Sequence, residues 1–336
     1  MANPRTIIRK PILITTRTPH GCGGASKSTA RCLELAGNEH DDAELRREAA
    51  VTTHLAAEMR ANIQRSLDKT LSDRNSEMKA AGITPFYPFD TTRKPAELTS
   101  YENHRFMMDW WSSDWGDPEL DAGHFRHREL SGQRLLGMNV DGFIQRPVCD
   151  FEYGTLAGRI RQEDYRPFLL ALYGYACFAM DSGNRYACED TLIPGGSSED
   201  APDYFSAAVV PAELGPALGL RWLLCYEEHD RSVVHLQKAA PSHWFAPGQS
   251  IQVEKCPTRF GQIRWTTQAK TGTESRPRWS VRVEFVKPFM ADLCVHIHPP
   301  DRQPLRSTSL GKLQSDRVVL PAALLGGRTE VSVEIT

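Results

Sequence analysis

The chain has 336 residues, a formal net charge of −2, 40% hydrophobic residues and 24% charged residues. These values are ordinary for a globular protein with a buried core, arranged in one large domain or two smaller ones. The near-neutral charge gives no electrostatic basis for binding nucleic acid or an anionic membrane. No apolar run approaches the about 20 residues that a membrane-spanning helix needs.

Residues 1–40 show no clear hydrophobic period and contain a segment rich in Gly, Ser and Thr. We interpret this part as an irregular or disordered N-terminal segment. Its apolar piece at 12–14 is shorter than the about 7–15 residues of a signal-peptide core. The eight cysteines form no CxxC pair, and several lie within apolar runs. These observations favour reduced thiols and a cytoplasmic protein.

The middle of the chain predicts a series of helices separated by loops. Apolar residues recur every four positions in one segment, and helical patterns follow in four more. The segment 163–183 is so apolar that we expect its helix to be buried on nearly all sides. We therefore predict a helical domain over 41–230. The five helical segments are 41–73, 94–111, 120–138, 163–183 and 211–230.

After Asp230 the hydrophobic period changes to two, which is typical of strands with one buried face. Three such runs predict a β domain over 231–336 with an antiparallel sheet or sandwich. His296 and His298 lie on one side of the second run, and we interpret that side as its solvated face. The buried residues are expected to be Trp279, Val281, Val283 and Phe285, then Leu293, Val295 and Ile297, then Val331, Val333 and Ile335.

Helices followed by a β domain, together with the segments 101–117, 150–183 and 220–265, resemble the six-hairpin, or (α/α)6-toroid, glycosidase superfamily. The resemblance covers roughly 85–290, and the last segment carries its most regular pattern: Trp244, Gly248, Ile251, Val253, Pro257, Thr258 and Gly261. It implies a mainly α protein followed by β: a toroid-like helical-hairpin domain, with fewer helices than the full ring, and a C-terminal antiparallel β-sandwich. It also implies a glycoside hydrolase-like protein in carbohydrate metabolism.

Cleavage of a glycosidic bond needs one carboxylic acid and a second carboxylate, and it needs no metal and no cofactor. Four acids near aromatic residues are candidates for this chemistry: Glu102, Asp114, Asp150 and Glu152. For each of them, capping a helix or lying on a solvated helix face is the alternative role.

Five further residues are candidates for binding a saccharide. Trp111, Trp115 and Tyr153 would stack on the apolar face of a sugar, although large aromatic residues also build cores. His104 and Arg105 stand next to Glu102 and would supply polar contacts.

We expect no metal site, because His124 and His127 share a helical period but no third ligand follows at a recognised spacing. The alternative to a hydrolase is a truncated, non-catalytic remnant that binds a saccharide or a protein. The apolar helix faces of an incomplete ring would then be covered by a partner chain or by a second copy.

Overall fold

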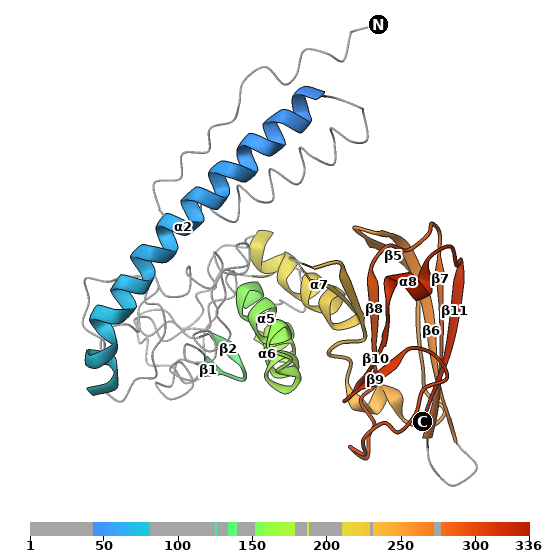
Figure 1. Cartoon of the computed structure of the whole chain (residues 1–336). Helices are drawn as coiled ribbons and strands as arrows, with labels where there is room; N and C mark the ends of the chain where they lie inside the picture. The colour runs from blue at the N-terminus through green and yellow to red at the C-terminus, as the bar shows by residue number, and fades with distance from the viewer. Residues whose placement is uncertain are drawn as a thin grey trace, which may run out of the picture.

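The computed structural model contains a group of helices, two large β-sheets and a two-stranded hairpin (Figure 1). It describes residues 43–80, 125, 134–139, 152–178, 187, 210–228, 231–271 and 277–336. Within these ranges, no helix is long and apolar enough to cross a membrane.

The four-stranded sheet is antiparallel, with strand order β11-β7-β6-β5. Its central strands, β6 (Gly261–Thr271) and β7 (Pro277–Phe285), alternate buried and accessible residues along nearly their whole length. The strand β11 (Glu330–Ile335) pairs with β7 and shows the same alternation, whereas β5 (Ser250–Thr258) has a register shift between Val253 and Cys256. The period-two pattern therefore predicted β7 and β11 correctly.

The five-stranded sheet has the order β3-β4-β8-β10-β9 and is mixed rather than antiparallel, because β4 and β8 are parallel. Its strands are β3 (Cys225–Glu227), β4 (Val233–Leu236), β8 (Asp292–His296), β9 (Lys312–Gln314) and β10 (Arg317–Leu320). Leu293 and Val318 of this sheet share one hydrophobic core with Trp265 and Val281 of the other sheet. The two sheets thus pack together in a way consistent with a β-sandwich.

The helices α5 (Glu152–Arg161), α6 (Tyr165–Phe178) and α7 (Val210–Leu224) form a layer beside the five-stranded sheet (Figure 1). The turn between α5 and α6 is tied to that sheet, because the Glu163 carboxylate pairs with Arg317 of β10 and lies 4.0 Å from Nζ of Lys238. One face of the five-stranded sheet therefore meets the other sheet, and its opposite face meets the helices.

The predicted helical toroid is wrong. The described residues contain five α-helices, of which only four have seven or more residues: α2 (Ala43–Ala80), α5, α6 and α7, with the short α8 (Ala322–Leu325) as the fifth. Three of these helices pack on one another and on a sheet, and two sheets account for most of the remaining structure. The architecture of the described residues is a mixed fold of helices and sheets, because α5, α6 and α7 pack on one another and α7 also packs on β3 and β4 of the five-stranded sheet.

Individual helical predictions also need correction. The segment 120–138 does not stay helical to its end, since β1 (Arg134–Leu135) and β2 (Met138–Asn139) form a short hairpin there. The helix α6 is not buried on nearly all sides, because Leu170 is 47% exposed and Tyr173 is 53% exposed. The segment 211–230 changes from helix to strand at Cys225.

Candidate functional site

Most of the site residues predicted from the sequence lie outside the described residues. These are Glu102, Asp114 and Asp150 among the acids, and His104, Arg105, Trp111 and Trp115 among the binding residues. Glu152 and Tyr153 begin α5, but only their backbone is described. The proposed pairing of two carboxylates across one cleft therefore stays a prediction.

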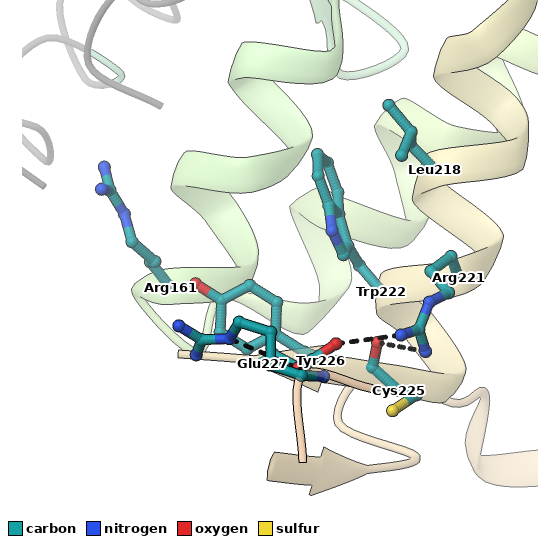
Figure 2. A pocket seen from close by; sticks show the side chains of 8 residues that line it. Arg161, Leu218, Arg221, Trp222, Cys225, Tyr226 and Glu227 are labelled. Atoms are coloured by element: carbon teal, nitrogen blue, oxygen red, sulfur yellow. Dashed lines mark hydrogen bonds and ion pairs between the residues drawn. The ribbon is translucent and has the colours of Figure 1, made fainter. Parts of the chain in front are cut away.

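A cavity of about 250 Å³ lies where the ends of α5 and α7 meet β3 and the turn between β5 and β6. We call it the arginine pocket. Figure 2 shows the end of α7, with Leu218 and Trp222, beside the strand that carries Tyr226 and Glu227. The lining residues are Arg161, Leu218, Arg221, Trp222, Cys225, Tyr226, Glu227 and Arg259.

The change from helix to strand at Leu224 and Cys225 builds this pocket locally. Arg221 and Trp222 lie in the last turns of α7, where a cation interacts favourably with the helix dipole. In β3, successive side chains point to opposite faces of the sheet. Tyr226 therefore shares a face with its partner His235, whereas Glu227 points to the other face, toward Arg221 and Arg259.

Glu227 is the single carboxylate among the described residues that line the pocket, and it is fully engaged. Its Oε1 lies 3.0 Å from Nη2 of Arg221, and its Oε2 accepts the backbone N–H of Arg259 over 2.8 Å. Oε2 also lies 3.4 Å from Nε of Arg259. Arg221 donates in addition to Sγ of Cys256 over 2.7 Å and to the carbonyl oxygen of Pro257 over 2.5 Å.

This geometry suits binding better than acid–base chemistry. Three guanidinium groups and one carboxylate line the pocket, so its described lining carries more positive than negative charge. Guanidinium groups are the preferred partners of planar anions such as carboxylates. The second carboxylate that glycosidic cleavage needs is missing from the described lining.

A second polar group lies on the helix-facing side of the five-stranded sheet. We call it the histidine cluster: His235 of β4, His296 at the end of β8, His298 two residues after that strand, Asp316 before β10, and Glu228 after β3. His296 and His235 are 0% and 3% exposed, so the predicted solvated face of β8 is wrong. The physical reason is that Tyr165 at the start of α6 covers this face, with its ring centroid 4.9 Å from that of His298.

Two separate sets of polar contacts hold the cluster. Nε2 of His235 lies 2.8 Å from Oε1 of Glu228, and Nδ1 of His235 lies 2.9 Å from Nε2 of His296. At the other end, Nε2 of His298 lies 3.1 Å from the carbonyl oxygen of Lys238. Nδ1 of His298 lies 3.5 Å from Oδ2 of Asp316.

Burial sets the protonation of these rings. It lowers the pKa of His296 to about 3, and it also lowers the pKa values of His235 and His298 below the ordinary value for histidine. Burial lowers the pKa of the neighbouring Lys238 as well. At neutral pH, all three imidazoles are therefore uncharged in the folded protein.

Two features of the sequence point to these groups. Arg221, Trp222 and Glu227 stand within seven residues at the end of an apolar helical run, where the period changes. The alternation of His296 and His298 along a strand is compatible with a solvated face or with a covered one, so only the fold decides between them.

The chain matches no protein-family model, and no curated protein matches it either. The expected membership of the six-hairpin glycosidase superfamily therefore rests on the residues alone.

Proposed function

We propose that the chain binds an anionic saccharide through the arginine pocket. The observation that carries this proposal is the combination of two aromatic side chains with three guanidinium groups around one cavity. The volume, the aromatic side chains and the positive charge of the pocket each match one property of a sugar acid: its size, its apolar ring face and its negative charge.

The size of the pocket supports a small ligand. Its volume of about 250 Å³ lies just below the range of about 300–1,000 Å³ in which proteins bind drug-sized molecules. A single sugar unit, or the terminal unit of a chain, fits this volume.

The aromatic side chains support a sugar in particular. Trp222 is half-buried, and Tyr226 is 7% exposed, so both rings are fixed in position while an edge still reaches the cavity. Large rigid rings of this kind contribute contact area at a low cost in entropy, and their faces suit the C–H groups of a pyranose.

The positive charge supports a sugar that carries a carboxylate or a sulfate. Glu227 holds Arg221 and Arg259 in place and offsets only part of their charge. An anionic group in the pocket would add a further charge-assisted partner for these guanidinium groups. Binding is thus favoured over hydrolysis, for which the acids at 102–152 stay the predicted and untested candidates.

The test is a titration of the full chain with glucuronic acid and, as a neutral partner of the same shape, with glucose. Glucuronic acid is expected to bind at least about 5-fold more tightly at low ionic strength, and added salt should reduce the difference. Arg161→Gln and Trp222→Leu should each weaken binding about 5-fold or more. Arg282→Gln is the matched control, because Arg282 is an exposed arginine of β7 on the other sheet.

Two results would contradict the proposal. Binding of glucuronic acid that is unaffected by both Arg161→Gln and Trp222→Leu would place the site elsewhere. Equal affinity for glucose and glucuronic acid would remove the anionic part of the proposal and leave saccharide binding alone.

A further inference from the structure

We propose that His296, His298 and Asp316 form a binding site for a divalent transition-metal ion of the zinc or iron(II) class. The site lies at one end of the five-stranded sheet and shares no residue with the arginine pocket. It therefore stands or fails independently of saccharide binding.

The proton on His296 is assigned by its neighbours. A carboxylate only accepts hydrogen bonds, so Nε2 of His235 must donate to Glu228 across 2.8 Å. With one proton on that ring, Nδ1 of His235 is an acceptor, and Nε2 of His296 must donate to it across 2.9 Å. The remaining nitrogen of His296, Nδ1, then carries a bare lone pair.

The proton on His298 is assigned in the same way. The carbonyl oxygen of Lys238 only accepts, so Nε2 of His298 donates to it across 3.1 Å. With one proton on this ring too, Nδ1 of His298 has a bare lone pair. That lone pair points at a carboxylate oxygen of Asp316, which is also an acceptor, only 3.5 Å away.

Three acceptor atoms therefore converge on one point without a donor among them. One ring nitrogen of His296, one of His298 and a carboxylate oxygen of Asp316 all lie within 4.8 Å of one another, and Oδ2 of Asp316 is near Nδ1 of both rings. Nδ1 of His296 is buried and has no hydrogen-bond partner among the described residues. Buried lone pairs that face one another are unfavourable unless a cation lies between them.

The distances suit a metal ion. Oδ2 of Asp316 lies 3.5 Å from Nδ1 of His298 and 3.9 Å from Nδ1 of His296. Tetrahedral ligands at about 2.0–2.2 Å from zinc are separated by roughly 3.3–3.5 Å. The two distances to Asp316 would therefore change by only a few tenths of an ångström on binding, whereas the two histidine nitrogens, which lie within 4.8 Å of each other, would have to move closer by more than that if their separation is near this limit. Two imidazoles and one carboxylate favour zinc or iron(II) over calcium or magnesium.

The surroundings of the three ligands are also those of a metal site. A histidine that binds a metal usually donates its other ring N–H to a carbonyl or a carboxylate, which fixes its orientation. His298 does so directly through Lys238, and His296 does so through the relay of His235 and Glu228. His235 is thus a positioning residue rather than a ligand.

An ion can reach the site from solvent. The side chains of His298 and Asp316 are 15% and 30% exposed, whereas His296 forms the closed inner end. The hydroxyl of Tyr165, which packs against both histidines, is buried without a hydrogen-bond partner in the described part of the chain.

The test uses the full chain, freed of metal with EDTA and titrated with Zn²⁺ by calorimetry. Uptake of one ion that depends on Asp316 is expected, with a dissociation constant at or below about 10 μM. Asp316→Asn and His298→Gln should each weaken this uptake more than about 10-fold. Zn²⁺ should raise the thermal midpoint of the wild type but not that of Asp316→Asn, and this comparison also shows that the variant is folded.

Two further variants sharpen the result. His235→Phe removes the acceptor that orients His296 and should weaken Zn²⁺ binding about 10-fold or more with all three ligands present. His243→Gln removes an exposed histidine outside the cluster and should leave binding unchanged. With Co²⁺ as the probe, visible absorption bands should appear without a sulfur-to-metal charge-transfer band, because no cysteine is among the three ligands.

No uptake of Zn²⁺ by the wild type would overturn the proposal and leave His298 and Asp316 as an ordinary ion pair. Uptake that is equally strong in Asp316→Asn and His298→Gln would also overturn it, because the ion would then be bound elsewhere. Either result leaves the binding of saccharides at the arginine pocket untouched.

Discussion

The hydroxyl of Tyr175 in α6 donates a hydrogen bond to the carbonyl oxygen of Ala212 in α7 over 2.5 Å. Ala212 stands four residues before Pro216, and a proline has no N–H to donate to that carbonyl within the helix. Tyr175 is fully buried, and its hydroxyl, from a neighbouring helix, gives the carbonyl of Ala212 the hydrogen-bond donor that Pro216 lacks. This contact joins α6 to α7 and supports the helical layer that holds the arginine pocket.

Tyr175→Phe should therefore lower the free energy of unfolding by about 1–2 kcal/mol, because a buried carbonyl loses its donor. In a Pro216→Ala background the same substitution should cost markedly less, since an alanine at this position restores the N–H within the helix. The coupling is measured by a double-mutant cycle in urea denaturation. Equal costs in both backgrounds would show that Tyr175 acts through its ring alone.

Gly311 and Gly327 both have positive φ, of 80° and 78°, but only Gly311 is also crowded. A Cβ at Gly311 would lie 2.5 Å from the carbonyl oxygen of Val319 and 2.6 Å from Cδ2 of Leu320, whereas a Cβ at Gly327 would meet nothing within 4 Å. Gly327→Ala should cost about 1 kcal/mol through backbone strain alone. Gly311→Ala should cost about 1–3 kcal/mol more, since it overpacks the hairpin of β9 and β10.

Thermal unfolding of the two variants under one set of conditions measures this difference. The comparison is controlled internally, because both substitutions add the same methyl group at nearly the same φ. Similar midpoints for the two variants would mean that β9 and β10 yield to the added atom at little cost.

The sequence predicted correctly the buried residues of strands that have one apolar face and one accessible face. In β7, Trp279, Val281, Val283 and Phe285 are all buried, as their spacing indicated. In β8 the apolar residues are buried as expected, but the other face is not solvated, because Tyr165 at the start of α6 covers it and His296 is buried there. A period-two pattern shows which face is apolar and leaves open what lies on the other one.

The end of α7 shows a second limit of sequence patterns. The apolar run through Leu223 and Leu224 continues into Cys225 and Tyr226, so the local pattern favours a longer helix. Pairing with β4 overrides that preference, since Cys225 lies opposite Leu236 and Tyr226 lies opposite His235. The strand begins where the following segment, β4, becomes available as an antiparallel partner, and no local residue type marks that point.

Neither polar site could be assembled from neighbours in the sequence. Arg259 reaches Glu227 because the turn between β5 and β6 folds back against β3, 32 positions earlier in the chain. His235 meets His296 because β4 and β8 are parallel neighbours, with 61 positions between them. Spacing rules for metal ligands cover short separations, so the sequence predicted no metal site here.

Arg159 and Asp164 fix the turn that carries Glu163 and Tyr165. Nη1 of Arg159 lies 2.6 Å from Oδ2 of Asp164, and its guanidinium carbon lies 3.9 Å from the centroid of the Phe125 ring. The arginine side chain is 5% exposed, whereas Asp164 is 37% exposed. Asp164→Asn removes the charge that partners a buried cation, and should cost about 1–3 kcal/mol after allowance for screening at the exposed carboxylate.

The measurement is the urea midpoint of Asp164→Asn beside that of Glu330→Gln. Glu330 forms a similar short ion pair, with 2.6 Å between its Oε2 and Nη2 of Arg282, but both partners are exposed on the four-stranded sheet. Glu330→Gln should therefore change the midpoint little. A larger loss for Glu330→Gln than for Asp164→Asn would contradict the assignment of the turn as the stronger contact.

Acid should destabilise the metal-free protein from about pH 6.5 downward, and the histidine cluster supplies the reason. Burial lowers the pKa of His296 to about 3 and also lowers the pKa values of His235 and His298. Below the ordinary pKa of histidine, the unfolded chain binds protons that the folded chain does not, so stability is lost as the pH falls from about 6.5 toward the lowered values. Lys238 and Arg317 add positive charge beside the rings, while Glu228 and Asp316 offset part of it.

Thermal midpoints of the wild type in EDTA, measured between pH 8 and pH 5, should fall steeply over this range. His298→Gln removes one of the three imidazoles of the cluster, so its thermal midpoint should fall less steeply with pH. The midpoint of His243→Gln should follow that of the wild type because His243 is exposed. A slope that is the same in wild type and His298→Gln would assign the acid sensitivity to other groups. Saturating Zn²⁺ should deepen the loss on acidification, because ligands at the proposed site must give up the metal as they take up protons.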